Sequence, residues 1–311
     1  MNKLLSVLGQ ALIILIQEIV SGLFGFLFRV KKSPKNVSGQ LALVTGGARG
    51  LGKAIAIRLA QEGCNLAICD VNIEEAQKTS EEIRSKFKIE CIAFKADVSD
   101  TQQVATLYNE IGEKMGTVDI LVNNAGILAP LGVLEGEDSD ITRVLNINLT
   151  SHFWMVRKFL PSMIEQKRGQ ILGICSAAGK SSIPFAASYC ASKFGVDGFY
   201  RALFDDMCLY EYNDFIKITC AFPGFINTRN DLENLLDETN EYIPRVQPDY
   251  AAEKIVEAML LEKQEILFPF SYRISTIMEY LVPLKTRIFM KREACKQGSG
   301  LLEKRINVTR K

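Results

Sequence analysis

Between residues 40 and 268, short apolar runs alternate with amphipathic stretches. Continuous apolar runs predict strands that are buried on both faces, and amphipathic stretches predict the helices that cover them. The pattern therefore predicts an α/β fold, a single doubly wound Rossmann domain with a parallel sheet. The expected strands are Leu41–Val44, Asn65–Cys69, Glu90–Phe94, Val118–Val122, Gln170–Cys175, Ile216–Ala221 and Glu265–Phe268, and two expected helices are Gly52–Glu62 and Ile73–Phe87.

The first 36 residues follow a different pattern. Residues 4–28 are mostly apolar and would extend roughly 37 Å as a helix, more than the ~30 Å hydrocarbon core of a bilayer. Their polar residues gather along one side, and a straight span would bring Glu18 near the middle of the bilayer at a cost of a few kcal/mol. A helix or hairpin lying in one leaflet avoids that cost, so we favour monotopic attachment over a full span. The basic residues at 29–35 then place the body in the cytosol.

The charge is distributed unevenly along the chain. Segment 1–36 holds five Lys/Arg and one Asp/Glu (+4), and segment 283–311 holds nine and two (+7). Because the whole chain carries +1, residues 37–282 carry −10. An acidic body with basic, apolar ends points to an anionic membrane surface rather than to nucleic acid. A basic tail that is only solvated is the alternative for the C-terminal end. We expect a membrane anchor at 1–36, the folded domain at 37–268, and an apolar then basic extension at 269–311.

Cysteine and histidine usage narrows the chemistry. The eight cysteines show no C-x-x-C pair and no metal-ligand spacing, which favours free thiols in a reducing compartment and no metal site. His152 is the only histidine, and no nucleophile elbow accompanies it. We therefore expect His152 to be structural rather than catalytic.

A glycine-rich segment lies between the first expected strand and its helix. Gly46, Gly50 and Gly52 would let the backbone approach a pyrophosphate at the helix N-terminus. Glycines also mark ordinary strand-to-helix turns, but Asp70 ends the next strand, as a dinucleotide site requires. Asp70 can bind a ribose 2′-hydroxyl and would repel a 2′-phosphate, whereas Arg49 could attract one. The nearer carboxylate predicts NAD over NADP.

Tyr189 and Lys193 form the second candidate for chemistry. Four residues apart on a helix, they would share a face. A buried ammonium beside a phenol favours the phenolate, so we expect the pKa of Tyr189 to fall from its usual ~10 toward neutrality. With Ser176 upstream and the glycine-rich segment, the pair predicts redox chemistry on a carbonyl or an alcohol.

Over residues 38–268 the sequence resembles the short-chain dehydrogenase/reductase family. The N-terminal apolar segment, residues 152–154 and residues 223–228 make it similar to the membrane- and lipid-droplet-associated branch. That branch holds the 17-beta-hydroxysteroid dehydrogenases of types 11 and 13 and the epidermal retinol dehydrogenases. The motifs that carry the resemblance are Thr45–Gly52, Asp97-Val98, Asn123–Gly126, Asn148, Ser176, Tyr189 with Lys193, and Pro223-Gly224.

The resemblance implies roles for a catalytic set. Tyr189 would exchange the proton of the substrate oxygen, and Ser176 would hydrogen-bond that oxygen. Lys193 would lower the pKa of Tyr189 and hold the nicotinamide ribose, and Asn148 would hold a water that links Lys193 to solvent. Taken singly, a Ser, Asn or Tyr is usually a satisfied polar group or a turn former; the complete set favours function.

The resemblance also implies a cofactor-binding set, in which Asp97 would contact adenine and Thr228 the carboxamide side. A homodimer through the helix of Tyr189 and a lid over residues 225–247 are further expectations. The cofactor-binding residues are Gly46, Arg49, Gly50, Leu51, Gly52, Asp70, Asp97, Val98, Asn124, Ala125, Gly126, Tyr189, Lys193, Pro223, Gly224 and Thr228.

These observations predict an NAD-dependent oxidoreductase that interconverts a lipophilic alcohol, such as a retinol, a hydroxysteroid or a fatty alcohol, and its carbonyl. It would act at the endoplasmic reticulum membrane or a lipid droplet, facing the cytosol. The alternative is a nucleotide-binding scaffold on such a membrane with negligible turnover.

Overall fold

The computed structural model describes residues 10, 12–13, 16–17, 33–128, 133–134, 136–227 and 245–296. The chain divides into two compact units, Met1–Lys35 and Asn36–Lys311. In the first unit, residues 10, 12–13 and 16–17 are helical and exposed, and residues 33–35 have no regular secondary structure. No helix among the described residues is both long and apolar enough to cross a membrane. Most of the predicted anchor lies outside the described residues.

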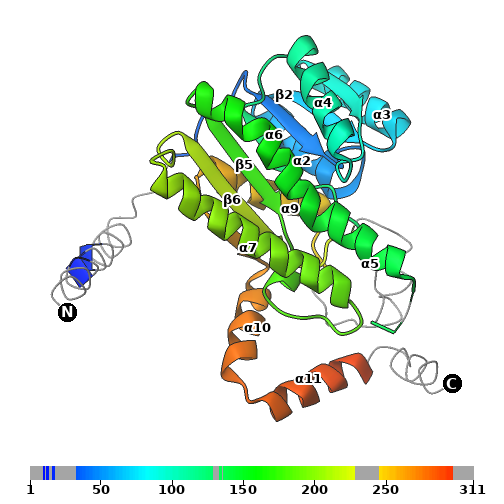
Figure 1. Cartoon of the computed structure of the whole chain (residues 1–311), viewed down its shortest axis with the longest axis vertical. Coiled ribbons are helices and arrows are strands. Elements are labelled where there is room, and N and C mark those ends of the chain that lie inside the picture. The colour runs from blue at the N-terminus through cyan, green and yellow to red at the C-terminus, as the bar shows by residue number, and fades with distance from the viewer. Residues whose placement is uncertain are drawn as a thin grey trace. The chain divides into compact units, whose positions relative to one another are not determined.

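The second unit is built on a parallel sheet of seven strands in the order β3-β2-β1-β4-β5-β6-β7 (Figure 1). Every neighbouring pair of strands is parallel, as the continuous apolar runs predict. The strands are β1 Leu41–Thr45, β2 Asn65–Asp70, β3 Cys91–Lys95, β4 Ile120–Asn123, β5 Gly169–Ile174, β6 Ile216–Pro223 and β7 Glu265–Phe268.

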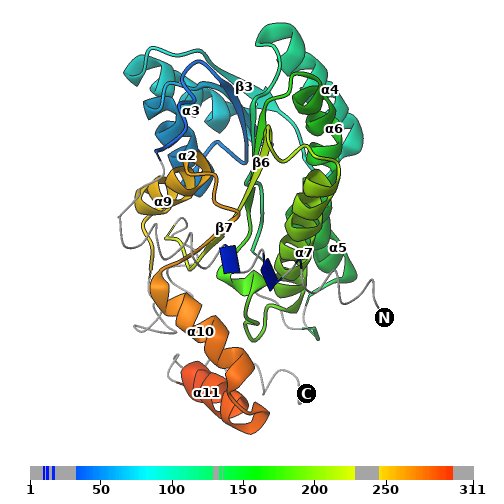
Figure 2. The same cartoon turned by 90° about the vertical axis from the view of Figure 1, so that its left-hand side faces the viewer.

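Helices cover both faces of the sheet, so the doubly wound prediction is confirmed (Figure 2). One face packs on α2 Gly50–Gln61, α3 Ile73–Lys86 and α9 Pro248–Leu260. The other packs on α4 Thr101–Lys114, α6 Ser151–Glu165 and α7 Ala187–Leu209. Short α5, Asp138–Leu145, leads through a π-helical turn at Asn146–Thr150 into α6.

The side chains of β1 show why the sheet needs two apolar faces. Successive side chains of a strand point to opposite faces. Ala42 and Val44 accordingly lie in the core under α2 and α9, and Leu41 and Leu43 lie in the core under α6. All four are buried. An amphipathic strand could not satisfy this packing, which is why the apolar runs identify the strands so well.

The sequence locates all seven strands to within two residues of their observed bounds. It does not predict the two helices after β7, α10 Phe270–Leu281 and α11 Leu284–Lys296. None of the residues of α10 is buried, so the helix lacks the inward apolar stripe by which a covering helix is recognised. In Figures 1 and 2, α10 and α11 lie outside the layered domain, beyond the carboxyl end of β7.

Candidate active site

The candidate site lies at the carboxyl edge of the sheet, where β1 and β4 are neighbours. From β1 the chain proceeds outward to β2 and β3, and from β4 it proceeds the other way to β5, β6 and β7. Such a switch point leaves a crevice beyond the strand ends in which nucleotides bind. The predicted residues follow β1, β2, β3, β4, β5 and β6 at this edge.

The glycine-rich turn after β1 requires its glycines. Gly46 and Gly50 have φ of 61° and 57°, a left-handed conformation that side chains disfavour. A Cβ on Gly52 would overlap the carbonyl oxygen of Gly46 and the side-chain amide of Asn124. The turn therefore leaves a backbone cradle at the N-terminus of α2, with Arg49 exposed at the N-cap position and Leu51 packed on the core.

Thr45 and Asn124 hold this turn against the end of β4. The Thr45 hydroxyl donates to the carbonyl of Val122 (3.1 Å) and accepts from the backbone N–H groups of Asn124 (2.9 Å) and Ala125 (3.1 Å). The Asn124 amide donates to the carbonyls of Thr45 (2.9 Å) and Gly46 (3.2 Å). Thr45 belongs to the matched motif, but the sequence alone assigns it no role.

Asp70 lies beside the glycine turn, at the end of β2. Its carboxylate accepts from the backbone N–H groups of Ala48 (3.1 Å) and Asn72 (3.0 Å). Thr79 donates to the carbonyl of Ala48 (2.7 Å), so the middle of the turn is held from both sides. A carboxylate oxygen can accept two hydrogen bonds, and each Asp70 oxygen accepts one of those described above. Asp70 can therefore also accept a hydrogen bond from a sugar hydroxyl.

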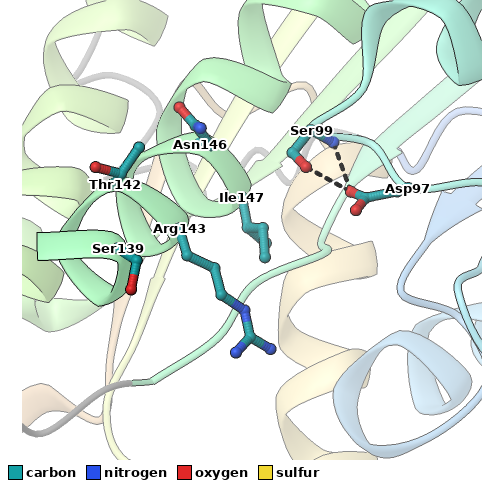
Figure 3. Close-up of a pocket in the computed structure, with 7 residues that line it drawn as sticks. All are labelled: Asp97, Ser99, Ser139, Thr142, Arg143, Asn146 and Ile147. Atoms are coloured by element: carbon teal, nitrogen blue, oxygen red, sulfur yellow. Dashed lines mark hydrogen bonds between the residues drawn. The ribbon is translucent and has the colours of Figure 1, made fainter. Parts of the chain in front are cut away.

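Asp97 lines a cavity of about 550 Å³ beside the end of β3 (Figure 3). Its carboxylate accepts from the N–H (2.9 Å) and the hydroxyl (2.6 Å) of Ser99, while Val98 is buried. The cavity adjoins the predicted adenine contact rather than Tyr189. Ser99 lines the cavity as well, and the remaining lining residues come from α5 and the turn after it: Ser139, Thr142, Arg143, Asn146 and Ile147.

Asn148 lies in the π-helical turn and is fully buried. Its side-chain carbonyl accepts from the N–H of Ile127 (2.8 Å), and its amide donates to the carbonyl of Ile127 (2.8 Å) and to Ser192 (3.3 Å). Asn148 thus joins the segment after β4 to α7. Single π turns inside helices frequently mark functional sites, but this sequence carries no local signal for one.

Tyr189 and Lys193 share one face of α7, as their spacing predicts. The Lys193 ammonium lies 5.8 Å from the centre of the Tyr189 ring and donates to the carbonyl of Ile174 (3.1 Å). Ser176 follows β5 and hydrogen-bonds Tyr189. A Cβ on Gly126 would lie 3.3 Å from Asn148 Oδ1 and 3.8 Å from Lys193 Nζ. The four predicted catalytic residues are therefore grouped together.

The expected fall in the pKa of Tyr189 is wrong for this structure. Burial raises the pKa of Tyr189 to about 12, although the hydrogen bond with Ser176 acts in the opposite direction. Burial also lowers the pKa of Lys193. Both shifts favour the neutral forms, because removal from water penalises charge. The Lys193 ammonium is directed to the Ile174 carbonyl, so its charge does not offset the burial of the phenol.

His152 is structural, as predicted. Its Nδ1 lies 3.0 Å from the hydroxyl of Tyr200, which also accepts from the Asn123 amide (3.0 Å). Burial, together with the charge of Lys193, lowers the pKa of His152 to about 3. A neutral, buried imidazole with this partner supports the packing of α6 on α7.

The C-terminal extension reaches the site at Gly224. The N–H of Gly224 donates to the carbonyl of Phe268 (2.7 Å), and a Cβ there would overlap the ring of Tyr272 on α10. Burial raises the pKa of Tyr272, which hydrogen-bonds the backbone of Phe225. Pro223 ends β6. Thr228 and most of the predicted lid, residues 228–244, lie outside the described residues.

Across the described ranges, no group of three or more His, Cys, Asp or Glu side chains is placed to hold a metal ion.

Comparisons with known proteins point to one family. The profile described as short chain dehydrogenase matches residues 40–239. Estradiol 17-beta-dehydrogenase 11 of Mus musculus is 32% identical over 274 residues, covering 85% of this chain and 89% of the relative. Epidermal retinol dehydrogenase 2 of Homo sapiens is 32% identical over 289 residues, covering 93% and 91%. 17-beta-hydroxysteroid dehydrogenase 13 of Rattus norvegicus is 30% identical over 259 residues, covering 82% and 83%.

A solved structure shows the same similarity. The short chain dehydrogenase/reductase from Burkholderia phymatum in complex with NAD superimposes with a TM-score of 0.72 at 25% identity. The match covers 79% of this chain and 94% of that one.

Acidification from pH 7 to pH 5 is expected to lower the free energy of unfolding by about 2 kcal/mol through His152 alone. The folded-state pKa of about 3 lies below the unfolded value of 6.5, so below pH 6.5 the unfolded chain binds the proton more readily. Stability is therefore lost as the pH falls. Urea unfolding of wild type and His152→Gln at both pH values measures the effect. Equal pH dependence in the two proteins would contradict it.

Proposed function

Because the chain belongs to the short-chain dehydrogenase/reductase family and is therefore an NAD(P)-dependent oxidoreductase that acts on CH–OH groups, we propose a more specific reaction. The protein interconverts a lipophilic alcohol and its carbonyl with NAD. The observation that carries the proposal is the grouping of Ser176, Tyr189 and Lys193 with buried Asn148 beside the glycine turn. A scaffold with negligible turnover would have no need of this grouping.

The cofactor fits the residues that are present. The turn at Gly46, Gly50 and Gly52 has no room for side chains and lies at a helix N-terminus, where a pyrophosphate is stabilised. Asp70 ends β2 and Asp97 follows β3, where they would hold the adenosine part of the cofactor. When bound, NAD(H) supplies or accepts the hydride.

Tyr189 is the proposed acid and base. With a pKa near 12 its phenol carries the proton at neutral pH, ready to protonate a carbonyl oxygen during reduction. Ser176 would hydrogen-bond the same oxygen and stabilise the charge that develops there. The Lys193 ammonium is held in place by the Ile174 carbonyl, close to where the nicotinamide ribose would lie. Asn148 positions α7 through Ser192, and its water-holding role stays a prediction.

The preference for NAD is proposed from Asp70 and Arg49. The Asp70 carboxylate is fixed by two backbone N–H groups at the turn, whereas the Arg49 side chain is exposed. A fixed anion beside the 2′-position would repel a 2′-phosphate more strongly than a solvated cation would attract it.

The lipophilic substrate is proposed from the relatives and from the surroundings of the site. The relatives are named for estradiol, 17-beta-hydroxysteroids and retinol, all lipophilic alcohols. The predicted lid carries apolar residues, and α10 brings the ring of Tyr272 against Gly224. We also propose attachment through residues 1–36 to the endoplasmic reticulum or a lipid droplet. A homodimer stays a prediction.

Tyr189→Phe is expected to lower kcat by roughly 10²–10⁴-fold, because the phenolic proton is lost while packing is kept. Turnover would be measured with NAD and a panel of retinoids, hydroxysteroids and long-chain alcohols. Tyr250→Phe, at an exposed position on α9, serves as the control and should match wild type. If no substrate gives turnover that Tyr189→Phe abolishes, the scaffold is the better description.

Asp70→Asn is expected to raise the NADP/NAD ratio of kcat/KM by roughly tenfold, since removing ~1.4 kcal/mol of repulsion gives that factor. The asparagine keeps an acceptor for Ala48, so the turn should persist. Arg49→Gln is the matched control and should not raise the ratio. An unchanged ratio in Asp70→Asn would overturn the assignment of cofactor preference to this carboxylate.

The full-length protein is expected to stay on membranes that are washed with concentrated salt. Deletion of residues 1–28 removes the apolar segment, so the same wash should release the truncated protein from the membranes. The truncated protein should still bind NAD, measured by calorimetry, since residues 36–311 form their own compact unit. Retention of the truncated protein after the wash would contradict an anchor at the N-terminus.

A further inference from the structure

The outer side of α10 is apolar and its inner side is polar. Tyr272 lies against Gly224, Thr276 donates to the carbonyl of Tyr272 (2.8 Å), and Glu279 hydrogen-bonds Ser181. On the opposite side, large apolar residues are exposed, among them Phe270 at 69% and Leu281 at 73%. Ile274 and Ile277 are exposed between them.

The positions of these residues around the helix confirm that the apolar side of α10 faces outward and the polar side faces inward. At about 100° per residue, the three covered residues Tyr272, Thr276 and Glu279 fall within about 35° of one direction. The four exposed apolar residues, at 270, 274, 277 and 281, fall within about 45° of the opposite direction. A helix on a water-facing surface has the reverse arrangement. The outer face of α10 therefore has the composition of a surface that is covered by an apolar phase.

Helix α11 also combines inward cations with exposed apolar residues, although the exposed apolar residues at 288–290 are consecutive and span about 200° of the helix. Arg287 donates to the backbone carbonyl of Glu279 (3.2 Å), and Lys291 donates to its carboxylate (2.8 Å). These inward cations leave Ile288, Phe289 and Met290 exposed. The two helices thus turn Glu279, Arg287 and Lys291 toward each other and the domain, and much of their apolar surface outward.

The inner side of the pair grips the loop between Ser176 and Tyr189. Lys291 donates to the carbonyl (2.9 Å) and the hydroxyl (2.7 Å) of Ser182, and the Glu279 carboxylate accepts from Ser181. Burial raises the pKa of Glu279, but Lys291 and the serine hydroxyls outweigh it and hold the pKa below its usual range. The loop that connects two catalytic residues is therefore tied to the C-terminal helices.

The charge of the pair indicates what covers its apolar face. Residues 270–293 hold five Lys/Arg against two Asp/Glu, a net charge of +3. Arg273, Lys285 and Arg292 are exposed, whereas Glu279 is paired inward with Lys291. An apolar face bordered by cations fits the interface of an anionic bilayer.

We propose that α10 and α11 form a lipid-docking clamp, whose outer face lies in the surface of an anionic bilayer and whose inner face holds loop 179–185 at that surface. The clamp would give an alcohol that is dissolved in the membrane a short path to Tyr189. Only this role of the clamp rests on the proposed function. Exposed Ile183, in the gripped loop, would meet the same lipid.

Fluorescence quenching tests the docking in the full-length protein. Phe270→Trp would be bound to phosphatidylcholine–phosphatidylserine vesicles with brominated acyl chains, and the signal of the native Trp154 subtracted. We expect quenching at least about twofold stronger than for Tyr210→Trp, a position of similar exposure (63%) at the opposite edge of the sheet. Quenching of Phe270→Trp should weaken in vesicles of phosphatidylcholine alone.

Equal quenching of the two variants on bound vesicles would overturn the proposal, even with residues 1–36 anchoring the protein. So would a dimer that dissociates in Ile277→Ser while brominated lipid leaves Phe270→Trp unquenched, because the face would then be covered by a second copy.

Hydrogen exchange tests the grip on the loop without relying on turnover, so the result is separate from the fate of the proposed function. Vesicle binding should slow exchange in α10 and in residues 179–185 of wild type. In Lys291→Met, α10 should stay protected while the loop loses its protection, and Lys285→Met should behave as wild type. Loop protection that survives Lys291→Met would overturn the coupling.

Discussion

The hydrogen bonds of Thr45 and Asn124 are the constraint on which the rest of the site depends. They join the end of β1 to the end of β4, the neighbouring strands at which the strand order of the sheet reverses. Through them the glycine turn is fixed relative to the segment that ends in Gly126. Gly126 in turn lies beside Asn148 and Lys193. A short series of hydrogen bonds from side chains to the backbone therefore holds the glycine turn against the segment that carries Gly126, next to Asn148 and Lys193.

Burial sets the electrostatics of the site. The phenol of Tyr189, the ammonium of Lys193 and the imidazole of His152 are all shifted toward their neutral forms. In such a setting a charge that develops on a substrate oxygen interacts strongly with the few dipoles aimed at it. The Tyr189 phenol therefore carries its proton at neutral pH. The same burial explains why Lys193 alone does not make Tyr189 acidic.

Much of the fold and part of the site could be predicted from the sequence, because the determining signals are local. The strands are short apolar runs, Gly46 and Gly50 mark left-handed backbone, and the spacing of Tyr189 and Lys193 fixes their common face. The rest depends on contacts between distant segments. The pKa of Tyr189 follows from packing that no spacing encodes. Helices α10 and α11 escaped prediction because large apolar residues of both are exposed and α10 buries none, so neither shows the inward apolar stripe that identifies a covering helix.

The π-helical turn at Asn146–Thr150 has a consequence for how this stretch can vary. A π turn is an α-helix that contains one additional residue, so α5 and α6 are out of phase with each other by about 100°. Removing one residue between them would restore regular winding and would rotate Asn148 away from Ile127 and Ser192. This stretch therefore cannot combine regular α-helical winding with an Asn148 amide that faces inward. Substitutions in this stretch can be absorbed one by one, whereas a change in its length cannot.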